Sequence, residues 1–204
     1  MIGAAAAPAA VAPDRAWFDR PAIELARDLL GARLVHRSSD GVVGGRIVEV
    51  EAYRGPEDRA AHSARGRTPR NAVMFGPPGH LYVYLVYGLH HCLNVVAGPG
   101  SKPEAVLIRS LAMDEGIELA RARRGPASLE HRLASGPGNV GRAMGVDLRL
   151  NGADLLAGPV HLEPRVGPMP RRRRGPRIGV DYAGDWAARP MRLWIADDRH
   201  VSRR

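Results

Sequence analysis

The chain has 204 residues, of which 30 are Lys or Arg and 21 are Asp or Glu, so its formal net charge is +9. This length is enough for one globular domain with a sizeable core, and a lone cysteine excludes both a disulfide framework within the chain and a cysteine-rich zinc site. No apolar run approaches the about 18 residues of a membrane span, and the charge indicates a polyanion such as DNA or RNA, unless it only reflects an arginine-rich codon usage.

The first part of the chain contains a tail, a helix and several strands. Residues 1–14 are rich in Ala and Pro and lack the basic start of a signal peptide, so we expect a disordered tail on a cytoplasmic protein. A helix is expected over 21–30, capped by Asp19 and ended by Gly31. Strands are then expected at 32–36, 43–53, 81–87, 92–97 and 105–109, separated by turns rich in Gly and Pro.

The second part of the chain adds two helices and two strands. A helix is expected over 114–124, because Asp114 and Glu115 at its start and three arginines at its end suit the helix dipole. Another helix begins near the turn at Ser135 and runs to about Met144. Many strands, few helices and no regular βαβ alternation predict an α+β fold, in which strands resume near 155–163 and 191–196.

Residues 163–177 separate the last two predicted strands and contain four consecutive arginines at 171–174. We expect a mobile basic loop here, in which the arginines either contact DNA or form a solvated charge run. The predicted architecture is a single compact domain over 15–204. Its core is a mixed, mostly antiparallel, curved β-sheet with peripheral helices and long loops.

The predicted strand at 47–53 carries two carboxylates. Its alternation places Glu49, Glu51 and Tyr53 on one face and small apolar side chains on the other. One interpretation is the solvated face of an edge strand. The other is a cleft in which one carboxylate acts as a general base.

A second predicted strand, at 81–87, is rich in tyrosine. Tyr82 and Tyr84 share a face, and Tyr87 lies at the strand end before Gly88. Tyrosine is a good strand former, so ordinary packing accounts for this pattern. The sharper interpretation is a stacking platform for a planar ligand such as a nucleic-acid base.

The loop between these two strands is basic, and it contains His62 together with five arginines. Such a loop is suited to dock against a phosphate backbone, although a lone histidine is more often a surface residue than a functional one. No metal site is predicted, because the adjacent His90, His91 and Cys92 point to alternate faces of a strand. No phosphate-binding loop or dinucleotide fingerprint is present, and no cofactor is expected. The five arginines are Arg54, Arg59, Arg65, Arg67 and Arg70.

Several long motifs occur in an order that resembles the alkyladenine (3-methyladenine, or methylpurine) DNA glycosylase family. The resemblance extends from about residue 20 to 201 and leaves out the tail and the arginine run at 171–174. The motifs are GRIVEVEAYRGPED at 45–58, AAHS at 60–63, TPRN at 68–71, LYVYLVYG at 81–88, HCLN at 91–94, VLIR at 106–109, SGP at 135–137 and GDWA at 184–187.

This resemblance implies a role for each site residue. Glu51 takes the position of the catalytic base, with Glu49 as its rival on the same face. Arg109 takes the position of the arginine that, with this glutamate and a backbone carbonyl at Ile178, positions the attacking water. The base pocket would further consist of Tyr53, His62 and Tyr84 as walls, and of Asn94, which crowds the amino group of guanine.

The resemblance also implies how the chain meets DNA. Tyr87 takes the position of the side chain that enters the duplex and fills the gap left by the flipped nucleotide. His90 and His91 depart from the bulky residues often found after the Tyr-Gly step. We expect contacts with the DNA backbone from Arg67, Thr68, Arg70, Leu89 and His90.

The implied function is that of a monomeric, nucleoid-associated, bacterial-type repair enzyme acting on double-stranded damaged DNA. It would flip out 3-methyladenine, 7-methylguanine, hypoxanthine or ethenoadenine and hydrolyse the N-glycosidic bond. Lys102 is the only lysine and lies in a turn, so we expect no Schiff-base lyase step. Two alternatives remain: a binding module that lost the reaction, and an enzyme of acidic metabolites whose charge is incidental.

Overall fold

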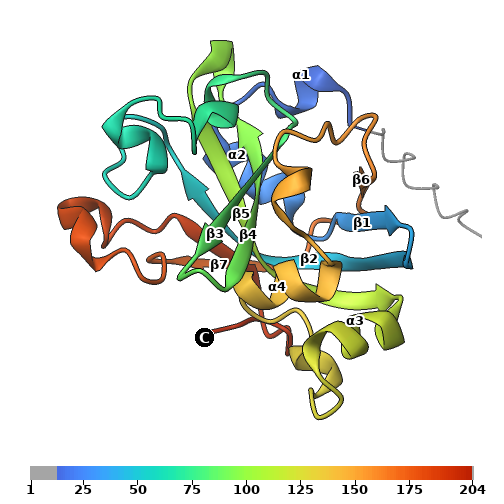
Figure 1. Cartoon of the computed structure of the whole chain (residues 1–204). Coiled ribbons are helices and arrows are strands. Elements are labelled where there is room, and N and C mark those ends of the chain that lie inside the picture. The colour runs from blue at the N-terminus through green and yellow to red at the C-terminus, as the bar shows by residue number, and fades with distance from the viewer. Residues whose placement is uncertain (1–12, 204) are drawn as a thin grey trace, which may run out of the picture.

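Two long antiparallel strands, β2 (Gly41–Tyr53) and β5 (Glu104–Glu115), form the centre of the molecule. The computed structural model describes residues 13–203. Around this central pair the sheet has the order β3-β4-β5-β2-β1-β6, while β8 also pairs with β2 and β7 pairs with β8 (Figure 1). The other strands are β1 (Arg33–Ser38), β3 (Leu81–Val86), β4 (His90–Ala97), β6 (Val160–Glu163), β7 (Arg172–Gly175) and β8 (Arg192–Ile195).

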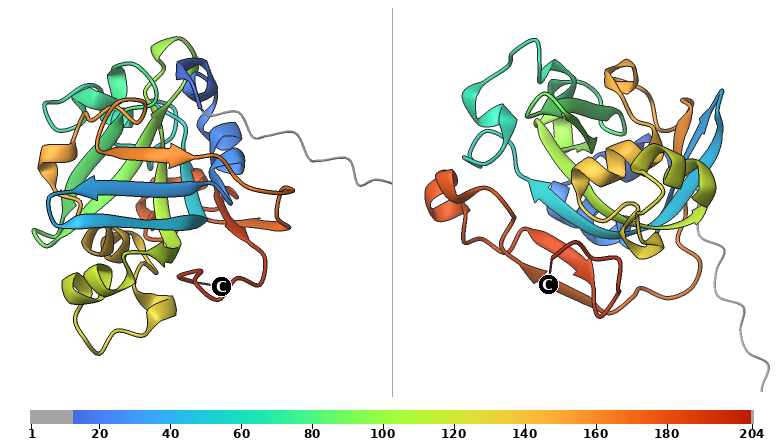
Figure 2. Two further views of the ribbon diagram at one scale, coloured as in Figure 1. Left: turned by 90° about the vertical axis from the view of Figure 1, so that its right-hand side faces the viewer. Right: turned by 60° about the horizontal axis from the view of Figure 1, so that its bottom comes forward.

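All of these pairings are antiparallel, and the curved sheet with few helices confirms the predicted α+β fold. Figure 2 shows β6, β1 and β2 side by side at one end of the sheet. Within the described residues, no helix is long and apolar enough to cross a membrane. The helices are α1 (Arg15–Phe18), α2 (Ala22–Leu29), α3 (Ile117–Arg124) and α4 (Pro137–Met144).

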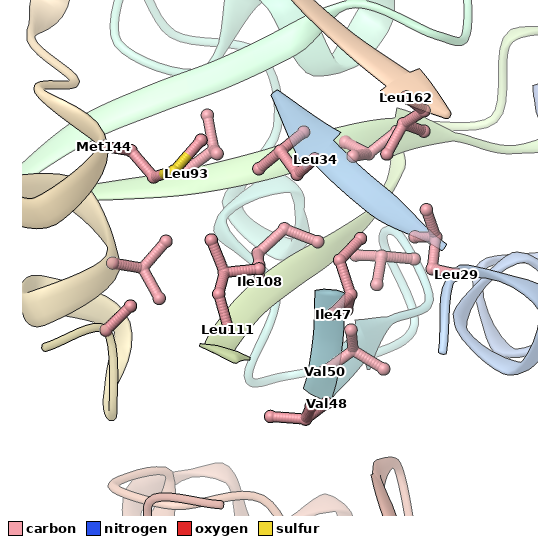
Figure 3. Packing of buried hydrophobic residues seen from close by; sticks show 14 of the residues in the cluster. Leu29, Leu34, Ile47, Val48, Val50, Leu93, Ile108, Leu111, Met144 and Leu162 are labelled. Atoms are coloured by element: carbon pink, nitrogen blue, oxygen red, sulfur yellow. The ribbon is translucent and has the colours of Figure 1, made fainter. Parts of the chain in front are cut away.

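The core lies between this sheet and two of the helices, where apolar side chains of β2, β4 and β5 pack with those of α2 and α4 (Figure 3). Val48, Val50 and Ala52 are fully buried there, as the alternation of β2 predicts. The register of β2 against β5 shifts on both sides of Glu49. Such bulges bend a strand and re-aim its side chains, and here they lie beside the carboxylate-bearing face.

The start of helix α2 is capped by a residue that is distant in the sequence. The cap predicted at Asp19 is wrong, because Asp19 accepts a hydrogen bond from the backbone N–H of Gly100 instead. Pro21 occupies the cap position of α2, and the N–H of Ala22 donates to Oε2 of the buried Glu104 at 2.6 Å. A carboxylate 82 residues away thus satisfies the helix start.

The helix predicted over 114–124 starts later than expected. Asp114 and Glu115 belong to β5, where both carboxylates pair with Arg33 at 2.8 and 2.5 Å. Gly116 has φ +65°, and a Cβ there would lie 2.2 Å from the carbonyl oxygen of Val42, so only glycine fits this turn into α3.

The predicted loop over 163–177 contains a strand. Residues 172–175 form β7 and pair with β8 through backbone hydrogen bonds, so this part of the predicted loop is a strand. Arg171 and Arg173 both pair with Asp197, which anchors this edge. Of the predicted tail, residues 1–12 lie outside the described part, while Asp14 accepts a hydrogen bond from the N–H of Trp17 and caps α1.

Candidate active site

A cavity of about 500 Å³ opens between the sheet and two loops. One loop follows β2 and the other follows β7, and both project on the same side as the tip of the β3–β4 hairpin (Figures 1 and 2). The structure brings to this cavity all the residues predicted for catalysis, the base pocket and intercalation, although they come from five separate segments. These residues are Glu51, Tyr53, His62, Tyr84, Tyr87, Asn94, Arg109 and Ile178.

Glu51 is the only carboxylate that lines this cavity within the part of the chain that the structure describes. Its Oε1 accepts the backbone N–H of Ile178 at 2.8 Å, and its Oε2 accepts the hydroxyl of Tyr53 at 3.0 Å. Burial raises the pKa of Glu51, against the opposing effects of Arg109, Ile178 and Tyr53. A buried carboxylate held by three donor groups and facing an open volume can take a proton from a bound water.

Glu49 has different surroundings, although it leaves the same strand on the same side. It does not line the cavity. Its carboxylate is fully buried and accepts four hydrogen bonds, which outweigh burial and lower its pKa. This saturation identifies Glu49 as structural and leaves Glu51 as the candidate base. The four donors are Nε of Arg109, Oγ of Ser110, Nη1 of Arg192 and the N–H of Ser202.

Arg109 connects these two carboxylates. Its Nε lies 3.3 Å from Oε1 of Glu49, and its Nη1 lies 3.3 Å from Oε2 of Glu51. Both distances join a buried cation to a buried anion, so the guanidinium offsets part of the burial cost of each carboxylate. The contact made by Ile178 uses its N–H, and the role expected for its carbonyl stays a prediction.

Aromatic side chains also line the cavity. The rings of His62 and Tyr84 lie 4.5 Å apart at 68°, and Nδ1 of His62 lies 2.7 Å from the hydroxyl of Tyr82. The neighbouring rings partly desolvate the imidazole, and this effect together with the nearby charge of Arg70 lowers the pKa of His62, which keeps it neutral near pH 7. Nδ2 of Asn94 donates to the carbonyl of Tyr82 at 2.9 Å, so its amide is held at the cavity floor.

Tyr87 lies at the tip of the β3–β4 hairpin and is 91% exposed. Tyr87 and Gly88 have φ +52° and +68°, and the N–H of Leu89 bonds to the carbonyl of Val86 at 3.0 Å. Residues 86–89 thus form a β-turn with positive φ at both central positions, where Asn or Gly is usual at the first, within a three-residue hairpin loop. A tyrosine in this strained conformation indicates a functional demand on the side chain.

The residues predicted to contact the DNA backbone are spread around this opening. Arg70 lines the cavity, and Thr68 lines a neighbouring cavity of about 320 Å³. Arg67 is exposed in the same loop, and Leu89 is 75% exposed beside Tyr87. His90 is half-buried and packs against Gly138 at the start of α4.

Sequence reasoning missed two residues that hold the site, and it placed a third, Tyr82, in a possible stacking platform without a contact to His62. Tyr82 orients His62, and its position beside Tyr84 was the available signal. Asp58 and Arg177 form a fully buried ion pair behind Tyr53. Arg177 lies 119 residues from Asp58, in a segment predicted as loop, so nothing local pointed to the pair. Among residues 13–203, no three His, Cys, Asp or Glu side chains come together as metal ligands.

Comparisons with known proteins agree with this geometry. The family model described as methylpurine-DNA glycosylase matches residues 16–199. Three relatives carry the name "Putative 3-methyladenine DNA glycosylase". The relative from Streptomyces avermitilis is 47% identical over 94% of this chain and 93% of its own, and that from Methanocella arvoryzae is 48% identical over 93% and 95%. The relative from Bacillus cereus is 42% identical over 92% and 97%. The chain therefore belongs to the methylpurine-DNA glycosylase family and is a DNA glycosylase.

Proposed function

We propose that this glycosylase flips an alkylated or deaminated purine out of duplex DNA and hydrolyses its N-glycosidic bond with a water activated by Glu51. The substrates would be 3-methyladenine, 7-methylguanine, hypoxanthine and ethenoadenine. The observation that carries the proposal is the carboxylate of Glu51, which faces an aromatic-walled cavity large enough for a purine. Release of the base leaves an abasic site and starts base excision repair.

Extrusion of the base comes first, because the glycosidic carbon cannot be reached inside the stack. Unstacking costs a few kcal/mol, which a side chain wedged into the duplex and contacts with the backbone offset. Tyr87 is the wedge, since it is exposed at the hairpin tip and also borders the cavity. Arg67, Thr68, Arg70, Leu89 and His90 contact the DNA backbone around it.

Recognition follows in the aromatic slot. A purine alkylated at N3 or N7 is cationic, so Tyr53 and Tyr84 attract it by about 0.5–2 kcal/mol more than a normal purine. The neutral His62 adds an aromatic edge without repelling the charge. Asn94 crowds the exocyclic amino group of guanine.

Hydrolysis then needs one water. Glu51 takes a proton from the water as the oxygen bonds to C1′ and the bond from C1′ to the purine nitrogen breaks, with its electron pair leaving on the base. The carboxylate also stabilises the positive charge that develops on the sugar. Arg109 and the backbone of Ile178 hold Glu51 and the water in line.

The chemistry ends with the free base, without strand cleavage. A lyase step needs an amine that forms a Schiff base with C1′. Lys102 does not line the cavity, and its Nζ lies 2.6 Å from Glu57 and 3.0 Å from Glu104. We therefore propose a monofunctional enzyme that acts as a monomer and needs no metal or cofactor.

A base-release assay on duplexes with one defined lesion each tests this proposal. Wild type releases the lesion base, and Glu51→Gln binds the same duplex without releasing it. Binding by both proteins with release by neither would instead identify a binding module. Binding that does not weaken with added salt would argue against DNA as the ligand, because phosphate contacts release counterions.

A further inference from the structure

Asp58 and Arg177 form a fully buried ion pair behind the cavity wall. Nη1 and Nη2 of Arg177 lie 2.5 and 2.8 Å from the two carboxylate oxygens of Asp58, so the contact is bidentate. The carboxylate also accepts the backbone N–H groups of Arg54 and Ala60, and Nη1 also donates to the carbonyl of Ala52. Neither charge reaches solvent, and together they have no net charge.

The guanidinium of Arg177 lies over the ring of Tyr53, with its Cζ 4.6 Å from the ring centroid. Tyr53 lines the cavity but Arg177 does not, so the guanidinium occupies the ring face that is turned away from the cavity. A purine stacked on the cavity face would have one ring between itself and a cation, with the matching anion beside that cation.

The charge on the far side of Tyr53 matters for some purines and not for others. A net positive charge there would repel a cationic purine through a water-free wall, where screening is weak, but would leave a neutral purine almost unaffected. A balanced pair acts only as a dipole, so the ring keeps most of its attraction for a cation. Asp58 therefore does more than accept hydrogen bonds from the loop after β2: it also neutralises the charge of Arg177 behind Tyr53.

We propose that the Asp58–Arg177 pair determines specificity. Because its two charges cancel, the wall at Tyr53 can accept cationic alkylpurines, and any net charge left on the pair would change the preference for cationic over neutral lesions. This inference rests on the proposed function. Asp58 and Arg177 touch neither the base nor the water and act through Tyr53.

The test measures the ratio of single-turnover release rates on two duplexes of one sequence, one with 7-methylguanine and one with ethenoadenine. Asp58→Asn leaves the permanently charged Arg177 unbalanced, and we expect the ratio of cationic to neutral release to fall about tenfold. Asp58→Ser, whose smaller side chain admits water beside Arg177, is a second variant of the same net charge. Both rates come from one preparation, so an inactive fraction cancels.

The double variant Asp58→Asn/Arg177→Gln is the matched control, because it removes both charges. We expect its ratio to return to that of wild type even though both rates are reduced. A merely structural role would lower both rates equally in Asp58→Asn and Asp58→Ser, and an unchanged ratio in both would overturn the inference. Failure of wild type to release either base would instead refute the proposed function itself.

Discussion

Glu49 and Glu51 leave β2 on the same face and are both fully buried, but they differ in how their oxygens are used. Glu49 accepts four hydrogen bonds and does not border the cavity, whereas Glu51 accepts two, contacts Arg109 and faces open space. Four donors lower the pKa of Glu49, while burial raises that of Glu51. The comparison indicates that unused acceptor capacity beside a cavity, more than burial, separates the candidate base Glu51 from Glu49.

Glu51→Gln should have the largest effect, and it acts only on chemistry. The amide cannot take a proton from water, so base release should fall by about 10²–10⁴-fold. Single-turnover release and equilibrium binding to a lesion duplex measure the two consequences. If Glu51→Gln kept wild-type release while Glu49→Gln lost it, the assignment of the two carboxylates would be reversed.

Glu49→Gln should act mainly on stability. It removes the anion that faces the buried Arg109 and Arg192, and a broken buried pair costs about 3–5 kcal/mol. Urea denaturation of the variant beside wild type gives the difference in the free energy of unfolding. A loss below about 1 kcal/mol would contradict a structural role.

The two glutamates should affect stability with opposite signs at neutral pH. The folded-state pKa of Glu51 is raised by burial, so its ionisation opposes folding, and Glu51→Gln should raise the free energy of unfolding at pH 7. This gain should disappear as the pH falls below the ordinary carboxyl value of 4.5. The pKa of Glu49 is lowered, so its contribution is present above 4.5 and is lost in acid. Tm measured against pH for both variants checks the signs.

Tyr53→Phe should have the smallest effect. The hydroxyl donates to Oε2 of Glu51 and stabilises its ionised form, so its loss raises the pKa of Glu51. The acid limb of the profile of release rate against pH should move up by about one pH unit, with the neutral plateau nearly unchanged. An acid limb that stays in place would mean that Glu51 is not the group titrating there.

Local patterns predicted the strands and the start of α4 because alternation and turn residues act over a few positions. The wrong predictions all involve distant partners. Glu104 caps α2, Arg33 holds Asp114 in β5, and β8 turns residues 172–175 into a strand. The residues of a local segment do not indicate which distant residues it will contact.

The candidate site follows a similar division. The resemblance to a known family, more than the local pattern, predicted the groups that border the cavity, and the structure brings them together. The groups behind them were not predicted, because Asp58 meets Arg177 and Glu49 meets Arg192 and Ser202 only after the sheet closes. The strand alternation left open which of Glu49 and Glu51 is the candidate base. The hydrogen-bond donors around each carboxylate give a physical reason to choose Glu51.

The contact of Ser202 with Glu49 has a consequence for synthesis on the ribosome. The N–H of Ser202 donates to a carboxylate 153 residues earlier, and the carbonyl of Arg203 accepts from Arg192. Since chains emerge from the N-terminus, β2 and β5 can pair long before residues 202–203 are synthesised. The buried carboxylate of Glu49 therefore gains its full set of hydrogen bonds only when Ser202 has left the exit tunnel.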